Sequence, residues 1–255
     1  MHPGALVHPD AQLDVGVRVG PFSIIGSKVR IGAGTVIGPH ALIEGNTTMG
    51  KNNRVFQFAT LGSDPQDLKY KGEDSRLIIG DGNTFRECCT VHKGTEGGIG
   101  ETRLGNGILV MAYAHVAHDC VIRDRVIMAN GATLAGHIDI EEAAIIGGLA
   151  AVHQFCRVGT LAMVAGGSIV VKDVAPYCTV QGNRAEMKGL NLIGLQRRGF
   201  SEDTIDAIKS AHRIIFRSGF LFKDGVEKVE TEVPTTPEVQ HLVDFLRVSE
   251  RGFIR

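Results

Sequence analysis

Residues 104–170 read LGNGILVMAYAHVAHDCVIRDRVIMANGATLAGHIDIEEAAIIGGLAAVHQFCRVGTLAMVAGGSIV, and an aliphatic residue returns in this stretch at every sixth position. A period of six matches neither the 3.6 residues of a helical turn nor the alternation of an ordinary strand. It is typical of a solenoid in which one short strand and one turn repeat. The series is Leu104, Val110, Val116, Ile122, Met128, Leu134, Ile140, Ile146, Val152, Val158, Val164 and Val170.

The same period organises the N-terminal part of the chain. Small residues mostly occupy the positions two before each aliphatic residue, where they can stack inside a narrow prism. A β-sandwich is the alternative, but its strands recur at a looser spacing of about 8–12 residues. We therefore predict an all-β solenoid, a parallel β-helix with three flat sides per coil, in which residues roughly 18 apart stack at about 4.8 Å. The aliphatic positions here are Val7, Leu13, Val19, Ile25, Ile31, Ile37, Ile43, Met49, Val55, Leu61, Ile79, Phe85 and Val91.

Two segments interrupt the period. Residues 63–76, SDPQDLKYKGEDSR, lack it, and residues 95–102 shift its phase by one residue. We predict that both loop outward from the prism. In a regular solenoid such loops are where binding function is usually placed.

The hexapeptide period ends after Pro176, and two helix starts follow it. One is the N-cap candidate Ser201 with acidic residues behind it, and the other is Thr236-Pro237. We predict a hexapeptide-repeat β-helix domain over residues 1–190 and a small α-helical domain over 191–255. Apolar residues recur at helical spacing after the two starts, at Ile205, Ile208, Ala211 and Ile215 and at Val239, Leu242, Val243 and Leu246.

Composition narrows the class of protein. The 255 residues include 27 basic and 28 acidic ones, so bulk charge indicates no nucleic-acid partner. Five cysteines without paired spacing argue against a disulfide framework. No apolar run approaches the roughly 18 residues of a membrane-spanning helix, and the N-terminus lacks the pattern of a signal peptide. We expect a cytoplasmic protein without a membrane span.

Histidines cluster in the second run of repeats. Folding the sequence on the coil period places His118, Gly136 and Gln154 in one column and Asp119 with His137 in the next. A glycine beside His118 should leave open space next to its imidazole, as a general base at a cleft requires. Asp119 could orient that ring. The alternative is that these histidines only cap turns.

Metal and thiol chemistry are the competing interpretations of the site. Histidine is a common zinc ligand, but no HExxH or paired-cysteine spacing is present, and we expect no metal. A nucleophilic cysteine is the other possibility. Cys89, Cys120 and Cys156 all fall two before a repeat aliphatic, in the slot that holds small residues elsewhere. We predict that these thiols are buried and inert, so that transfer chemistry would be direct.

Several motifs in order carry a family resemblance. They are the hexapeptide run, DLKYKGE at 67–73, HDC at 118–120, LAGH at 134–137, AVHQFC at 151–156 and RRGF at 197–200. Together they resemble the UDP-N-acetylglucosamine O-acyltransferases, hexapeptide-repeat acyltransferases that carry out the first step of lipid A biosynthesis. The likeness covers almost the whole chain, including the helical tail.

The resemblance implies a left-handed β-helix and a homotrimer with active sites between subunits. It implies no cofactor of the protein itself, because the 3-hydroxyacyl donor is carried on the phosphopantetheine of acyl carrier protein. The acceptor would be UDP-N-acetylglucosamine or its 3-amino analogue. By position, His118 resembles the general base that deprotonates the 3-hydroxyl, and Asp119 resembles its orienting partner. The backbone amide of Gly136 resembles an oxyanion-hole donor.

The resemblance also implies a set of substrate-binding residues. Gly166 matches the position that limits acyl-chain length, where a missing side chain favours a longer chain, although a simple turn glycine is the alternative. Ile193 departs from the family pattern, which often has an acidic residue there, so contacts to the nucleotide could differ. The implied substrate-binding residues are Gln66, Asp67, Lys69, His115, His137, His153, Gln154, Asn191, Arg197 and Arg198.

Three rival functions stay open at this point. An N-acyltransferase that acts later in the same pathway would carry a separate N-terminal domain, whereas here the repeats begin by Val7. A zinc-dependent hexapeptide protein similar to carbonic anhydrase would bind stoichiometric metal. A purely structural solenoid would bind no UDP-sugar.

Overall fold

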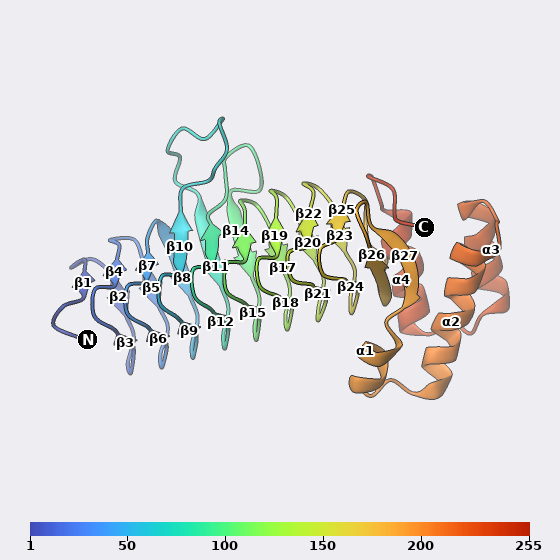
Figure 1. Cartoon of the computed structure of the whole chain (residues 1–255), viewed down its shortest axis with the longest axis horizontal. Coiled ribbons are helices and arrows are strands. Elements are labelled where there is room, and N and C mark those ends of the chain that lie inside the picture. The colour runs from blue at the N-terminus through green and yellow to red at the C-terminus, as the bar shows by residue number, and fades with distance from the viewer.

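Short strands stack on three sides of a long prism, and helices pack beyond its C-terminal end (Figure 1). The computed structural model describes residues 1–255. Three sheets of nine, eight and ten strands form the sides. Each complete coil contributes one strand to each sheet, and β26 and β27 at the end of the prism both join the third sheet. Every strand pair is parallel except the last, in which β26 and β27 run antiparallel.

The first sheet consists of β1 (Leu6–Val7), β4 (Ile24–Ile25), β7 (Leu42–Ile43), β10 (Thr60–Ser63), β13 (Thr90–His92), β16 (His115–Val116), β19 (Thr133–Leu134), β22 (Ala151–Val152) and β25 (Ile169–Val170). The second consists of β2 (Gln12–Leu13), β5 (Arg30–Ile31), β8 (Asn46–Met49), β11 (Arg76–Ile79), β14 (Glu101–Leu104), β17 (Val121–Ile122), β20 (Asp139–Ile140) and β23 (Arg157–Val158). The third consists of β3 (Arg18–Val19), β6 (Val36–Ile37), β9 (Arg54–Val55), β12 (Thr84–Phe85), β15 (Leu109–Val110), β18 (Ile127–Met128), β21 (Ile145–Ile146), β24 (Met163–Val164), β26 (Cys178–Gln181) and β27 (Glu186–Leu190).

The register confirms the predicted coil. Val116 pairs with Leu134, and Leu134 pairs with Val152, so aliphatic residues 18 apart stack on one another. All three are buried. The small slots two before them are filled as expected, for example by Ala114 and Ala132, both fully buried. Removal of these stacked side chains from water supplies most of the stabilisation, at about 25 cal/mol per Å² of apolar area.

Both interruptions leave the prism as predicted. The first loop lies between β10 and β11, and the second lies between β13 and β14, and both stand above the coils in Figure 1. Thr60 pairs with Thr90, 30 residues on, and Thr90 pairs with His115, 25 residues on. The first loop therefore keeps the hexapeptide phase, whereas the second shifts it by one residue.

The corners of the prism require left-handed backbone, and several non-glycine residues adopt it. Asp119, His137 and Phe155 share one edge, with φ of 59°, 62° and 63°. Arg125 and Ala143, with φ of 59° and 56°, lie on another edge. A side chain in this conformation costs about 1 kcal/mol or more relative to ordinary backbone. These two groups of corner residues mark two different edges of the prism.

The chain ends in four helices: α1 (Leu192–Arg197), α2 (Glu202–Arg217), α3 (Phe222–Glu232) and α4 (Pro237–Arg247). Both predicted starts are confirmed, because the Ser201 and Thr236 hydroxyls accept from the amides of Thr204 and Val239. The last strand, β27, ends at Leu190; whether residues 1–190 and 191–255 fold as separate units stays a prediction. None of these helices has the length and hydropathy that crossing a membrane requires.

A hydrogen-bonded ion pair fastens α4 to the β-helix. Nε2 of His241 lies 2.8 Å from Oε2 of Glu141, which also accepts from the Thr160 amide and hydroxyl. Nearby, the Arg157 guanidinium stacks over the Phe245 ring at 4.1 Å and donates to its carbonyl at 3.2 Å. These contacts set the position of the helices against the last coils.

This ion pair should make stability depend on pH. Its hydrogen bond with Glu141 raises the pKa of His241 above 6.5, although burial opposes the shift. Burial raises the pKa of Glu141, but hydrogen bonds from His241 and Thr160 outweigh it and leave the pKa below 4.5. The stabilisation is therefore complete between pH 4.5 and 6.5. It disappears at higher pH as His241 deprotonates and at lower pH as Glu141 protonates.

We expect His241→Gln to lower Tm by about 2–4 °C near pH 6, which corresponds to roughly 1 kcal/mol. The loss should shrink toward pH 9, where the wild type has also lost the pair. Scanning calorimetry from pH 5 to 9 measures it. His8→Gln, an exposed histidine at the far end of the prism, is the control. A Tm loss that is equal at pH 6 and pH 9 would contradict the assignment.

Candidate active site

His118 lies just beyond β16, and its imidazole covers the next coil. A Cβ built on Gly136 would come within 2.6 Å of the ring. The sequence predicted open space beside His118, and both residues line a cavity there. The imidazole fills the position of the missing Gly136 side chain, because only glycine allows a ring to lie this close to the backbone. The amide N–H of Gly136 donates to no acceptor within the protein, so it is available to a ligand.

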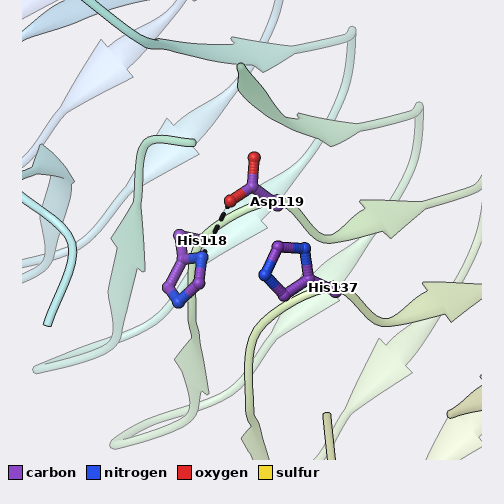
Figure 2. A group of neighbouring side chains, drawn as sticks. All are labelled: His118, Asp119 and His137. Carbon is purple, nitrogen blue, oxygen red and sulfur yellow. Dashed lines mark hydrogen bonds and ion pairs between the residues drawn. The ribbon is translucent and has the colours of Figure 1, made fainter. Parts of the chain in front are cut away.

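Asp119 follows His118 in the chain and orients its ring. The side chain of His118 is 14% exposed, whereas that of Asp119 is fully buried. Nδ1 of His118 lies 2.8 Å from Oδ2 of Asp119, the dashed contact in Figure 2. Burial raises the pKa of Asp119, but hydrogen bonds from His118 and Thr95 outweigh it and keep the pKa below its usual value. An ionised carboxylate only accepts, so the proton sits on Nδ1 and Nε2 keeps a free lone pair.

Other histidines surround this pair. The ring of His137 meets that of His118 edge to face at 5.0 Å and stacks on Phe155 at 4.6 Å (Figure 2 shows the two histidines). Nδ1 of His115 lies 2.6 Å from the Thr90 hydroxyl. Burial is the first cause that lowers the pKa of both His115 and His137. Both rings are therefore favoured as neutral groups that can donate or accept a hydrogen bond.

Two cavities gather most of the side chains that the sequence singled out. A cavity of about 460 Å³ is lined by Gln66, His115, His118, Gly136, His153 and Gln154, together with apolar residues that extend to Val171. A neighbouring cavity of about 820 Å³ lies between the two loops and is lined by Asp67, Lys69 and His137. The first combines a titratable ring with an apolar floor, and the second is strongly polar.

The predicted residues of the tail lie elsewhere in this chain. Arg198 lines a cavity of about 520 Å³ with Arg125 and Ala143, on a different edge from Asp119. Arg197 is exposed beside it. The side chain of Asn191 caps α1, accepting from the Gly194 amide at 3.0 Å and donating to the Leu161 carbonyl at 2.9 Å.

Gly166 lines neither of the two cavities near His118. It stacks over Gly148 as the coil period predicts, since its built Cβ would approach the Gly148 carbonyl at 3.2 Å. Ile193, the departure from the family pattern, is exposed.

The predicted burial of the three cysteines is confirmed. Cys89, Cys120 and Cys156 are fully buried. Burial raises the pKa of Cys89 and Cys120 to about 12 and that of Cys156 to about 11. Their thiols would not ionise at neutral pH, so they are unsuited to act as nucleophiles.

Sequence reasoning missed several residues that build the site. Thr95 and Ile99 of the second loop bind the Asp119 carboxylate. Lys93 pairs with Asp64 at 2.9 Å and joins the two loops. The glycine-rich run TEGGIG at 95–100 was the available signal, because glycines mark close backbone approach to another group.

His118, Asp119 and His137 place their ligand atoms within 4.8 Å of one another, a grouping that could hold a metal ion. However, two amides, a hydroxyl and an imidazole already donate to the Asp119 oxygens. A carboxylate offers about four lone-pair directions, so none is left for an ion. Two imidazoles alone fall short of the three protein ligands typical of catalytic zinc. The arrangement favours proton transfer.

Comparison with known proteins covers the whole chain. Residues 173–254 match the model of the second domain of UDP-N-acetylglucosamine O-acyltransferases, and residues 10–45 and 101–136 match the bacterial transferase hexapeptide model. The chain is 53% identical over its full length to an acyl-[acyl-carrier-protein]–UDP-N-acetylglucosamine O-acyltransferase of Myxococcus xanthus, covering 99% of that protein. It is 52% identical, with the same coverage, to the enzyme of that name from Thiobacillus denitrificans.

Solved structures agree with this likeness. The crystal structure of UDP-N-acetylglucosamine O-acyltransferase from Moraxella catarrhalis superposes with a TM-score of 0.97 at 44% identity, covering 100% of this chain and 99% of that one. The fold class is thereby confirmed as a left-handed parallel β-helix of hexapeptide repeats with a C-terminal helical region. Identity above 50% along the whole length, joined to this fold, leads to one conclusion: the chain belongs to the UDP-N-acetylglucosamine O-acyltransferase family.

Proposed function

We propose that this protein transfers a 3-hydroxyacyl chain from acyl carrier protein to the 3-position of UDP-N-acetylglucosamine, with His118 as the general base. The substrates are those in the names of relatives about 50% identical over the full chain. The resemblance puts this reaction first in lipid A synthesis and in the cytoplasm. The main support for this proposal is the hydrogen-bonded His118–Asp119 pair, which lies at a cavity that is also lined by Gly136, whose amide has no acceptor within the protein.

The chemistry follows from the lone pair on Nε2 of His118. This nitrogen removes the proton of the sugar 3-hydroxyl while the hydroxyl oxygen attacks the thioester carbonyl. The carbonyl oxygen becomes an oxyanion, which the Gly136 amide can stabilise. Collapse breaks the carbon–sulfur bond, and the imidazolium returns the proton to the departing thiolate of phosphopantetheine. Asp119 stabilises the imidazolium throughout, and no acyl-enzyme forms.

The two cavities divide the substrates by chemistry. The apolar floor near Val171 suits the acyl chain, whereas Asp67, Lys69 and His137 offer donors and acceptors for the sugar nucleotide. A lysine and arginines are suitable partners for phosphates. His115, His153, Gln154 and Gln66 would complete the lining around the reacting groups.

The proposal includes a homotrimer with active sites between subunits. It is supported by the separation of Arg198 from Asp119 onto different edges of the prism. A second copy that turns the Arg198 edge toward His118 would complete the nucleotide site with Asn191 and Arg197. Native mass spectrometry of the purified protein tests the trimer.

One experiment tests the function. Purified protein is given UDP-N-acetylglucosamine or its 3-amino analogue with a panel of 3-hydroxyacyl carrier proteins, and products are identified by mass spectrometry. The proposal expects one acylated UDP-sugar and free carrier thiol. The preferred acceptor distinguishes ester from amide formation. Absence of any acylated sugar would contradict the proposal.

Gly166 matches the family's length-limiting position and lies outside the cavity at His118, so it should set the upper limit of acyl length for a chain that extends beyond that cavity. A Cβ at this position would lie 3.2 Å from the Gly148 carbonyl oxygen and 3.9 Å from its amide nitrogen, so the backbone accepts a side chain there with a small adjustment. We expect Gly166→Met to lower kcat/KM for the longest accepted chain by about tenfold or more. Activity with shorter chains should stay near wild type and serves as the internal control. An unchanged chain profile would make Gly166 an ordinary turn glycine.

A further inference from the structure

The carboxylate of Asp119 is enclosed by the second loop. The Thr95 hydroxyl donates to Oδ2 at 2.6 Å, and the Thr95 amide lies 3.1 Å from Oδ1. The Ile99 amide donates to Oδ1 at 3.0 Å. Thr95 itself is 3% exposed. The loop therefore supplies three of the four donors around the carboxylate, and His118 supplies the fourth.

We propose that Thr95 is a positioning residue for the acyl transfer, acting through Asp119 to hold His118 in its reactive orientation and tautomer. The inference rests on the proposed function, because it assigns a further residue to that same site. Oδ2 receives both the Thr95 hydroxyl and Nδ1 of His118. Thr95 thus fixes the oxygen that orients the base.

The shape of the loop is specific to this task. A Cβ on Gly98 would lie 2.3 Å from Cγ of Asp119, and a Cβ on Gly94 would lie 2.2 Å from the Glu101 amide. Only glycines let the backbone close this tightly around the carboxylate. On the other side, the Asp119 amide donates to the Thr102 hydroxyl at 2.9 Å. The loop therefore fixes the carboxylate of Asp119, and β14 fixes its backbone.

Removing one donor from a buried anion has two consequences. The carboxylate gains freedom to rotate, and a buried charge loses compensation, which raises its pKa. Imidazoles of His118 and His137 are the titratable groups that face it. An Asp119 carboxylate that takes up a proton at higher pH no longer accepts from Nδ1 of His118 there, so on the acid side kcat should begin to fall at a higher pH. Both effects act on kcat and not on substrate binding.

Thr95→Val removes the hydroxyl and keeps the shape. We expect kcat to fall about tenfold or more, with KM for UDP-N-acetylglucosamine unchanged and the acid limb of the pH–kcat profile moved to higher pH. Thr95→Ser should restore both quantities to near wild type. Thr35→Val is the matched control, because Thr35 is equally buried and its hydroxyl donates to Gly50, far from the site. If Thr95→Val does not fold, Thr95→Ala takes its place.

A double-mutant comparison separates positioning from general stability. In an Asp119→Asn background, Thr95→Val should have no further effect on kcat, because the group through which it acts has changed. A further tenfold loss in that background would overturn the proposal, as would wild-type kcat and pH profile for Thr95→Val alone. Wild type and His118→Ala are assayed in parallel. Absence of transfer by the wild type would refute the proposed function and this inference together, whereas transfer by the wild type with an inert Thr95→Val refutes only the inference.

Discussion

Replacing His118 with alanine should lower kcat/KM for acyl transfer by about 10²–10⁴-fold, the usual contribution of a general base. The variant keeps the Gly136 amide and both cavities, so substrates can still bind, but no group remains to take the proton of the attacking hydroxyl. No other histidine nitrogen is oriented by a buried carboxylate in the same cavity. The loss should therefore appear in kcat and leave KM for the sugar nucleotide within a few-fold.

Initial rates with a saturating 3-hydroxyacyl carrier protein measure this effect. Circular dichroism and native mass spectrometry check that the variant is folded and assembled like the wild type. His40→Asn is the control: His40 is stacked between Phe22 and Phe58 on a corner with φ of 55°, away from the cavity, and asparagine accepts that backbone. If His118→Ala turned over substrate at nearly the wild-type rate, His118 would not be the general base.

The β-helix could be predicted from the sequence because its signal is repeated. Each coil contributes three aliphatic positions and three small slots. An unusual residue in one slot, such as Cys89, therefore does not hide the period. The same repetition predicted the columns that bring His118 beside Gly136 and Asp119 beside His137. Local signals also predicted α2 and α4, because each has a side-chain cap. α3 was missed since Leu221 provides no side-chain cap and Gly225 weakens its helical pattern.

The parts of the site that could not be predicted depend on irregular backbone or on where the helical tail lies against the prism. Thr95 binds Asp119 from 24 residues away, through a loop whose path follows no period. The orientation of the His118 ring over Gly136 depends on side-chain rotation, which spacing does not specify. Arg198 belongs to the helical tail, and the coil period does not predict that the tail places it at the edge of Arg125 and Ala143. The coil period thus predicts which residues stack in a column. It does not predict which hydrogen-bond donors reach the site from the loops or from a neighbouring edge; these are known only from the structure.

Gly136→Ala should be the second most damaging change to the proposed reaction, although it adds a single methyl group. The new Cβ would lie 2.6 Å from Cε1 and 2.8 Å from Nε2 of His118, so the imidazole must move. Movement of about 1 Å at a catalytic group can cost roughly 10²-fold in rate. We expect kcat to fall by about that factor. Tm should change little, since the ring can swing toward the cavity.

Gly148→Ala is the control, because Gly148 has the same position in the repeat as Gly136. Its new Cβ would meet only the Asn130 carbonyl, at 3.4 Å, so kcat should stay within about threefold of wild type. Equal kcat in the two variants would mean that the closeness of His118 to Gly136 has no part in the reaction.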